Sequence, residues 1–366
     1  MAEQAELALA AQLRPEDAQH LATNGNSPFA RTWTVAASRP KGFERRLHQA
    51  RMLVRWGICG EPLVAAKFAT HAMHDAVRRA VAEFRPDAVL LELAQSAQFV
   101  TKLGGIPCIL TDHEAGVPAN TQTDLGAWAD RRDRRLWANY VRRHFAAADL
   151  LQAVTAEDAA QLGQMLGRQV EVRPPAIVIP ANPSPRLGTP LRMLFLGSYS
   201  HEPNARAARV LATEVLPLVR RQVPDAELWL AGPDCNRIET LAGKGVRVVG
   251  FRDSLASLFA EVRLVLSPLY SGGGFRMKVL AALSHGVPVV TNALGARGVA
   301  APAPAKTVHE TSEALADAAT AMLLDERRCA DAGALAHRWA SENLSPHAVA
   351  QTQLKRIRDL LARQKK

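Results

Sequence analysis

The sequence predicts an α/β fold with two doubly wound, Rossmann-type domains that face a cleft. Short apolar segments alternate with helix-like segments from about residue 70 onward, which is typical of parallel strands joined by crossover helices. A run of prolines between residues 174 and 190 interrupts this alternation near the middle of the chain, because proline favours neither helix nor sheet. The chain has 366 residues, enough for two domains that each bury a core.

The first half of the chain alternates helices and strands from residue 70 to residue 172. One helix opens at Thr155, with Asp158 three residues later as a variant of the capping box. The other predicted helices are 70–84, 94–103 and 130–148, and the predicted strands are 87–93, 105–110, 150–154 and 170–172.

The second half repeats the alternation more clearly. Its predicted strands are 192–196, 227–231, 246–249, 264–266 and 287–291. Its predicted helices are 204–221, 255–261, 275–285, 312–324, 326–342 and 346–363. In doubly wound sheets, ligands bind beyond the carboxyl ends of the strands, so we expect the functional site there.

Composition excludes several classes of protein. No apolar run approaches the roughly 18–20 residues that span a bilayer, and the polar N-terminus is not a secretory signal, so we expect a cytoplasmic protein. The four cysteines are scattered without metal-ligand spacing, so we expect no metal and no disulfide. Net charge is +10, which fits either polyanionic partners or simply an arginine-rich protein. With aromatic residues at only 5% and no recognisable module, we expect no nucleic-acid partner.

A glycine-rich loop in the second half carries the chemistry. The predicted strand 264–266 ends at Pro268, and the loop 271–274 then leads into a helix. Glycines let the backbone approach a ligand closely, and a helix N-terminus favours phosphate through its free N–H groups. Arg276 and Lys278 fall in the first helical turn, where cations are unfavourable for the helix itself and so indicate a bound anion. The alternative is a surface turn with two solvated cations.

The same segment resembles a known family. The stretch SGGGFRMKVLAALSHGVPVVT, followed by NALGARGV, resembles the nucleotide-binding segment of retaining glycosyltransferases of family four. LRMLFLGSYSHEPNARAA and PDAELWLAG resemble earlier parts of that domain, and RPDAVLLE and GIPCILTDHE resemble strands of the acceptor domain. The resemblance implies a GT-B fold: an N-terminal acceptor domain over 1–183, a linker at 184–190, a C-terminal nucleotide-sugar domain over 191–345, and a last helix, 346–366, packed back on the N-terminal domain.

The resemblance also implies catalytic roles. Arg276 and Lys278 would neutralise the donor's diphosphate as it leaves, and His113 would face the donor sugar. The alternative for His113 is an ordinary histidine at a strand end. No cofactor is implied, since the nucleoside-diphosphate sugar is itself the donor substrate.

Further positions are implied to bind the donor. Asn204 is also expected to cap a helix. The implied donor-binding residues are Gly197, Ser198, Asn204, Phe251, Arg252, Gly272, Gly273, Gly274 and Ala281.

Two departures from the family pattern stand out. Ala281 occupies the position of a glutamate that hydrogen-bonds the nucleotide ribose, and Gly273 occupies a second acidic position. Residues 6–12 resemble the second strand of the family's first domain, so we expect the first strand and its glycine-rich loop to be missing.

Three functions remain open. The first is transfer of a sugar from a nucleoside-diphosphate donor to a glycan or lipid-linked envelope acceptor, with retention. The second is a catalytically impaired relative that binds nucleotide, glycan or a partner protein, which Ala281 favours. The third is a nucleotide-sugar epimerase, which the lack of glutamates disfavours.

The basic helix that contains Arg131–Arg143 bears on where the protein acts. Trp128, Trp137, Tyr140 and Phe145 lie on or next to it. Basic and aromatic residues on one helix suit an anionic membrane surface, so peripheral association with the inner membrane face is one expectation. A solvated, charged helix is the other.

Overall fold

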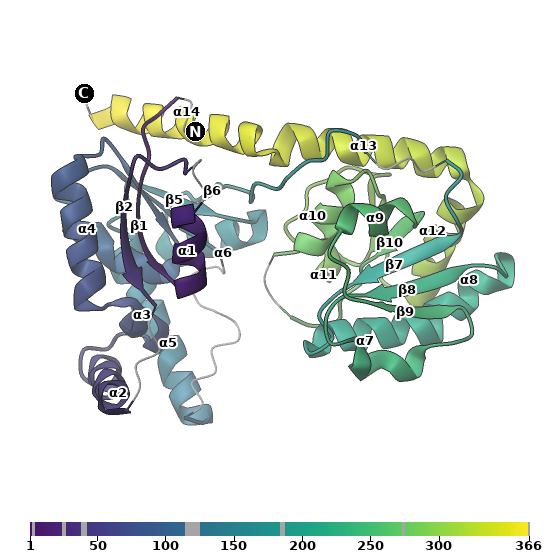
Figure 1. The fold of residues 1–366 in the computed structure, drawn as a ribbon, viewed down its shortest axis with the longest axis horizontal. Coiled ribbons are helices and arrows are strands. Elements are labelled where there is room, and N and C mark those ends of the chain that lie inside the picture. The colour runs from purple at the N-terminus through teal and green to yellow at the C-terminus, as the bar shows by residue number, and fades with distance from the viewer. Residues whose placement is uncertain are drawn as a thin grey trace. The chain divides into compact units, whose positions relative to one another are not determined.

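The structure, a computed structural model, describes residues 1, 4–23, 27–37, 42–113, 125–183, 187–272 and 275–364. The chain forms two compact α/β units, Met1–Pro174 with Ala350–Lys366, and Pro175–Val349 (Figure 1). Parallel sheets in both units confirm the predicted fold class. The division falls at the start of the proline-rich segment, ahead of the predicted linker at 184–190, of which residues 184–186 lie outside the described residues.

The first unit contains two parallel sheets in its described residues. A two-stranded sheet pairs β1 (Ala8–Leu13) with β2 (Arg31–Ala36), and a four-stranded sheet has the order β3-β4-β5-β6. These four strands are β3 (Val89–Glu92), β4 (Cys108–Asp112), β5 (Leu150–Ala153) and β6 (Glu171–Val172). The helices are α1 (Pro15–Thr23), α2 (Gly42–Gly57), α3 (Leu63–Phe68), α4 (His71–Phe84), the 3-10 helix η1 (Ala94–Lys102), α5 (Ala127–Phe145), α6 (Ala156–Leu166) and α14 (Pro346–Gln364).

Local chemistry explains the boundaries of several elements. Thr155 caps α6 as predicted, since its side chain accepts a hydrogen bond from the N–H of Asp158. The strand predicted at 105–110 lies at Cys108–Asp112 instead, because Gly104 and Gly105 turn the chain with φ of +65° and +85°. Most of α14 belongs to this unit, where Gln353 accepts a hydrogen bond from Gln152 at 3.0 Å.

The second unit has a six-stranded parallel sheet with the order β12-β11-β10-β7-β8-β9. Its strands are β7 (Arg192–Leu196), β8 (Glu227–Ala231), β9 (Val246–Gly250), β10 (Leu264–Leu266), β11 (Val289–Thr291) and β12 (Lys306–Val308). Its helices are α7 (Glu202–Val210), the π-helix η2 (Leu211–Val215), α8 (Leu216–Gln222), the 3-10 helix η3 (Cys235–Leu241), α9 (Leu255–Ala260), α10 (Met277–Ser284), α11 (Ala293–Ala296), α12 (Ser312–Leu324) and α13 (Glu326–Leu344).

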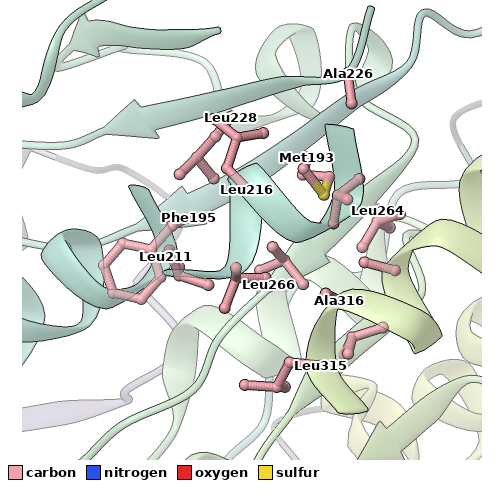
Figure 2. Close-up of a cluster of buried hydrophobic side chains, with 14 of the residues drawn as sticks. Met193, Phe195, Leu211, Leu216, Ala226, Leu228, Leu264, Leu266, Leu315 and Ala316 are labelled. Atoms are coloured by element: carbon pink, nitrogen blue, oxygen red, sulfur yellow. The ribbon is translucent and has the colours of Figure 1, made fainter. Parts of the chain in front are cut away.

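Each face of this sheet has its own core. Successive strand residues point to opposite faces, so Met193 and Phe195 pack on one side with Leu211 and Leu315 of the covering helices (Figure 2). Leu194 packs on the other side, in a core that also receives residues of α9, α10 and α13. The sheet is therefore doubly wound, and its strand order reverses between β7 and β10.

Candidate functional site

The candidate site lies where the strand order reverses, at the carboxyl ends of β7 and β10. In an open parallel sheet the loops that follow two such strands run in opposite directions, which leaves a crevice between them. The loop after β7 leads into α7, and the loop after β10 leads into α10. Most of the implied donor-binding residues follow these two strands. Gly273 and Gly274 lie outside the described residues.

Two glycines allow these loops to come together. Gly272 has φ of +99°, and a Cβ on it would lie 3.3 Å from Cγ of Pro203, in the first turn of α7. A Cβ on Gly197 would lie 2.8 Å from Cγ of Asn204, closer than real side chains approach. Both positions therefore require glycine for close packing, and the wall of the site here is largely backbone.

Asn204 links the two loops. Its Nδ2 donates to the carbonyl oxygen of Ser198 at 2.9 Å, and its Oδ1 accepts from Nζ of Lys278 at 2.6 Å. The expectation that Asn204 caps α7 is wrong, because the N-cap is His201 and Asn204 is the third residue of the helix. Its side chain is used across the site instead.

Lys278 is a cation held in a poorly solvated place. Its Nζ lies 4.4 Å from the centre of the Phe195 ring, besides its bond to Asn204. Burial lowers the pKa of Lys278 to about 7, with a further contribution from the charge of Arg276. An anion bound beside Nζ would restore the full positive charge, so the lysine is prepared to gain a proton as a phosphate arrives.

This pKa predicts a pH-dependent affinity for nucleoside diphosphate. Above pH 7 the empty protein holds Lys278 increasingly neutral, so binding must take up a proton from solution. We expect the affinity for UDP to fall from pH 7 to pH 9, by up to about tenfold per pH unit, because the phosphate groups of UDP are already almost fully ionised in this range and Lys278 loses its charge. Calorimetry in buffers of different ionisation enthalpy measures the proton uptake, and a Lys278→Arg variant should show none.

Arg276 plays a different part from Lys278. Its side chain is only 4% exposed, its Nε donates to the carbonyl oxygen of Leu294 at 2.9 Å, and Nη2 donates to that of Gly272 at 3.3 Å. These bonds tie the loop after β10 to α11. Helix α10 begins directly after Arg276, which makes no side-chain cap, so the helix N-terminus opens toward this loop.

Asn292 completes this framework and was missed by the sequence reasoning. Its Oδ1 accepts from the N–H of Leu269 at 3.0 Å and of Gly295 at 2.9 Å, while its Nδ2 donates to the carbonyl oxygen of Leu269. A Cβ on Gly295 would lie 2.3 Å from the carbonyl oxygen of Ser267. Asn292 follows the carboxyl end of β11, which lies beside β10, and this position in the predicted sheet could have identified Asn292 from the sequence.

Residues 190–325 match the family described as "Glycosyl transferases group 1". The matched segment runs from the approach to β7 to the end of α12, so it includes the whole group around Lys278. This segment is therefore similar to the glycosyltransferase group 1 domain. Comparison with curated proteins gives no match.

Solved structures share the fold of the chain. HepE of Anabaena in complex with UDP has a TM-score of 0.63 at 14% identity, over 97% of this chain and 100% of that chain. A glycosyltransferase from Rickettsia africae has a TM-score of 0.62 at 11% identity, over 97% and 99%. Sucrose-phosphate synthase from Thermosynechococcus elongatus has a TM-score of 0.57 at 18% identity, over 80% and 78%. These likenesses show the GT-B fold, and with the family match they support a glycosyltransferase.

The chain is shorter than some of the structures it matches. It covers 59% of a TarM chain from S. aureus, with a TM-score of 0.54, and 58% of a second TarM chain, with a TM-score of 0.57. One of those TarM structures contains UDP, fondaparinux and a GlcNAc-glycerol compound.

Ala281 lies one turn into α10. Its side chain packs partly against the core on the α10 side of the sheet. Its carbonyl oxygen accepts from Oγ of Ser284 at 2.9 Å and contacts Nδ1 of His285 at 2.8 Å. The position thus lies on the same helix as Lys278 but offers no polar side chain to a ligand.

Phe251 and Arg252 lie apart from the Lys278 group. They follow β9, which is two strands away from β7 in the sheet, about 10 Å at the usual strand spacing. Phe251 is 67% exposed. Among the described residues no hydrogen bond, ion pair or ring contact joins either of them to Lys278 or Asn204, so their role in binding a base stays a prediction.

Ser198 faces an acidic residue that the sequence reasoning did not single out. Its Oγ donates to Oδ2 of Asp234 at 3.0 Å and lies 2.8 Å from Oγ of Ser200. Hydrogen bonds from Ser200 and Ser198 lower the pKa of Asp234. Asp234 follows β8, so it belongs to the same edge of the sheet.

His113 lies in the first unit, directly after β4. Its Nε2 is 3.1 Å from Oε2 of Glu92, the last residue of β3. Arg173 follows β6 and donates from Nη2 to both oxygens of Glu92 at 2.6 Å. Glu92 and Arg173 were missed. Glu92 ends β3 and His113 follows the neighbouring β4, whereas Arg173 follows β6 at the other edge of the four-stranded sheet. They form a polar cluster at the carboxyl edge of this unit's sheet.

Two features are absent from the residues that the structure describes. No helix there is both long and apolar enough to cross a bilayer. No group of three or more His, Cys, Asp or Glu side chains there is arranged to hold a metal ion.

Proposed function

We propose that this protein transfers a sugar from a nucleoside-diphosphate donor to a glycan or lipid-linked envelope acceptor, with retention of anomeric configuration. One observation carries the proposal: the half-buried Lys278 contacts Asn204 and Phe195 at the N-terminal turn of α10, where the strand order reverses within the segment that matches group 1 glycosyltransferases. A cation of lowered pKa at a helix N-terminus is suited to a diphosphate leaving group. HepE, which has the same fold, was solved with UDP, so UDP is the first nucleotide to test.

The residues of the chain would act chiefly on the leaving group. Lys278 would gain its proton as the diphosphate binds and hold that charge while negative charge grows on the β-phosphate. Arg276 would add positive potential while keeping the loop after β10 in place. The leaving phosphate would take the proton of the acceptor hydroxyl on the face where the bond to the anomeric carbon breaks, which retains configuration.

Slow hydrolysis of donor sugars tests the proposal without knowledge of the acceptor. The protein is incubated with a panel of UDP- and GDP-sugars, and the anomeric protons of the released sugar are followed by NMR. We expect one donor to be hydrolysed, with the retained anomer formed first. Release of the inverted anomer would contradict retention, and a Lys278→Met variant controls for contaminating hydrolases.

Ala281 supports a second candidate, a catalytically impaired relative that binds nucleotide or glycan. The position offers no carboxylate for ribose, and a charged hydrogen bond of that kind contributes about 1.5–3 kcal/mol. UDP binding without hydrolysis of any donor would favour this candidate.

An Ala281→Glu substitution is expected to tighten UDP binding about tenfold or more, because a carboxylate one turn beyond Lys278 would accept from the ribose hydroxyls. Calorimetric titration measures the change. Ala282→Glu is not a suitable control, since Ala282 is fully buried, whereas Met277→Glu places a carboxylate at a half-exposed position of the same helix. Unchanged affinity in Ala281→Glu would mean that the ribose lies elsewhere.

The peripheral membrane location also remains part of the proposal. The lipid-linked acceptor suggests work at the cytoplasmic face of a membrane, and α5 supplies exposed arginines. Trp137, Tyr140 and Phe145 are buried in the core of the first unit, so they cannot contribute to that surface. Trp128, at 64% exposure, can.

A further inference from the structure

Helix α2 carries a continuous apolar stripe on its exposed face. Phe43, Leu47, Val54 and Ile58 follow at intervals of four, seven and four residues, so on a helix they lie on one side; Ile58 comes directly after the last helical residue. They are 78%, 42%, 51% and 81% exposed. Ala50, at the middle of the stripe, is exposed as well. Apolar side chains gathered in this way mark a contact surface.

The opposite face of α2 is firmly packed. Trp56 is only 8% exposed, and its Nε1 donates to Oδ1 of the buried Asp133 in α5 at 3.0 Å. Arg132 of α5 stacks on the Trp56 ring at 4.9 Å and donates to the carbonyl oxygen of Gly57 at 2.8 Å. Figure 1 shows α2 beside the end of α5 in this unit. The stripe is therefore presented by an anchored helix.

Exposed arginines surround the stripe. Arg46 and Arg51 lie on α2 to either side of it, and Arg131, Arg134 and Arg135 are exposed on the adjoining half of α5. Among the described residues, none of these five forms an ion pair. Acidic residues are scarce on these two helices. The sequence of α2 contains one acidic residue, and that of α5 contains two, Asp130 and the fully buried Asp133.

The aromatic residue at this junction also suits a membrane interface. Trp128, in the first turn of α5, is 64% exposed and packs edge-on against Trp56 with ring centres 5.9 Å apart. Tryptophan prefers the headgroup level of a bilayer, where its ring contacts both apolar chains and polar groups.

We propose that α2 is the element by which the protein lies in the surface of an anionic lipid bilayer. The stripe faces the acyl chains, while Arg46, Arg51 and the arginines of α5 contact lipid phosphates. The basic residues around the stripe complement the negative charge of lipid phosphates, which favours lipid over a protein groove. A second copy is disfavoured because two such basic surfaces would repel one another. This inference rests on the membrane location in the proposed function and adds the helix that contacts the lipid, and vesicle binding can be measured without a donor or an acceptor.

Vesicle sedimentation of the full chain tests the proposal. We expect binding to vesicles that contain phosphatidylglycerol, much weaker binding to pure phosphatidylcholine, and release at high salt. The double variant Leu47→Gln, Val54→Gln removes half of the stripe and should weaken binding about tenfold or more. Arg46→Gln, Arg51→Gln should weaken it to a similar extent and reduce the preference for anionic vesicles.

The control is Leu324→Gln, a change of the same type at a 62% exposed leucine of the second unit, which should bind as the wild type does. Circular dichroism verifies that each variant is folded. Undiminished binding of the stripe variant, or no binding of the wild type to anionic vesicles, would overturn the proposal. Self-association of the wild type that the stripe variant abolishes, without vesicle binding, would show that a second copy covers α2 instead.

Discussion

Replacing Lys278 by methionine is expected to weaken UDP binding about 100-fold while making the empty protein more stable. The loss follows from removing a charge-assisted contact to the diphosphate in a poorly solvated place, which contributes about 1.5–3 kcal/mol. Methionine keeps the length and the contact with Phe195 but carries no charge. Calorimetry with UDP and thermal unfolding without it measure the two effects.

The stability effect has a definite pH dependence. The folded-state pKa of Lys278, about 7, lies below its unfolded value of 10.5, so the unfolded chain binds more protons between these values. Wild-type stability therefore gains from this group as the pH rises from 7 to 10.5. We expect Lys278→Met to be stabilising by about 1 kcal/mol at pH 7, and to lose this advantage toward pH 10. A variant that is less stable than the wild type at pH 7 would contradict the assigned burial.

Replacing Gly232 by alanine is expected to destabilise the protein by about 3 kcal/mol or more. Gly232 follows β8 with φ of +135°, and a Cβ on it would lie 2.1 Å from the carbonyl oxygen of Gly197. The obstructing atom is backbone, so it moves only if the loop after β7 moves. Since that loop carries Ser198 and leads to Asn204, UDP affinity should fall as well, by about tenfold.

Gly243→Ala provides the matched control for Gly232→Ala. Gly243 has a comparable φ of +106°, but nothing lies within 4 Å of the position of its Cβ. We expect this variant to lose only the conformational part, about 1 kcal/mol, with unchanged UDP affinity. Thermal unfolding compares the two. Equal losses in both variants would mean that the contact with Gly197 plays no part.

The position of the candidate site could be predicted from the sequence, but the surroundings of its residues could not. The glycine-rich segment and its helix are local features, so the position of Lys278 at the start of a helix could be predicted. The environment of Lys278 could not, because Phe195 and Asn204 are brought to it from β7 and α7 by the order of the strands. The same limit applies to Arg276, whose partner Leu294 lies beyond the next strand.

The fold shows a similar division between local and long-range information. Strands β7, β8 and β10 begin and end as predicted, because each is a short apolar run bounded by polar or turn residues. Strand β2 and helix α2 were missed. Of the six residues of β2 only Trp33 is buried, and α2 presents its apolar stripe outward, so neither has the pattern of a core element. Strand β2 forms where the chain packs against α4, and α2 forms where it packs against α5, so long-range contacts determine both elements.

Titration of UDP into the wild-type protein tests the central claim, that a nucleoside diphosphate binds at the N-terminus of α10. We predict one site with a Kd between about 10 μM and 1 mM, binding that Lys278→Met weakens strongly, and no comparable binding of uridine. Absence of heat up to about 10 mM UDP, or equal affinities for UDP and uridine, would contradict the claim.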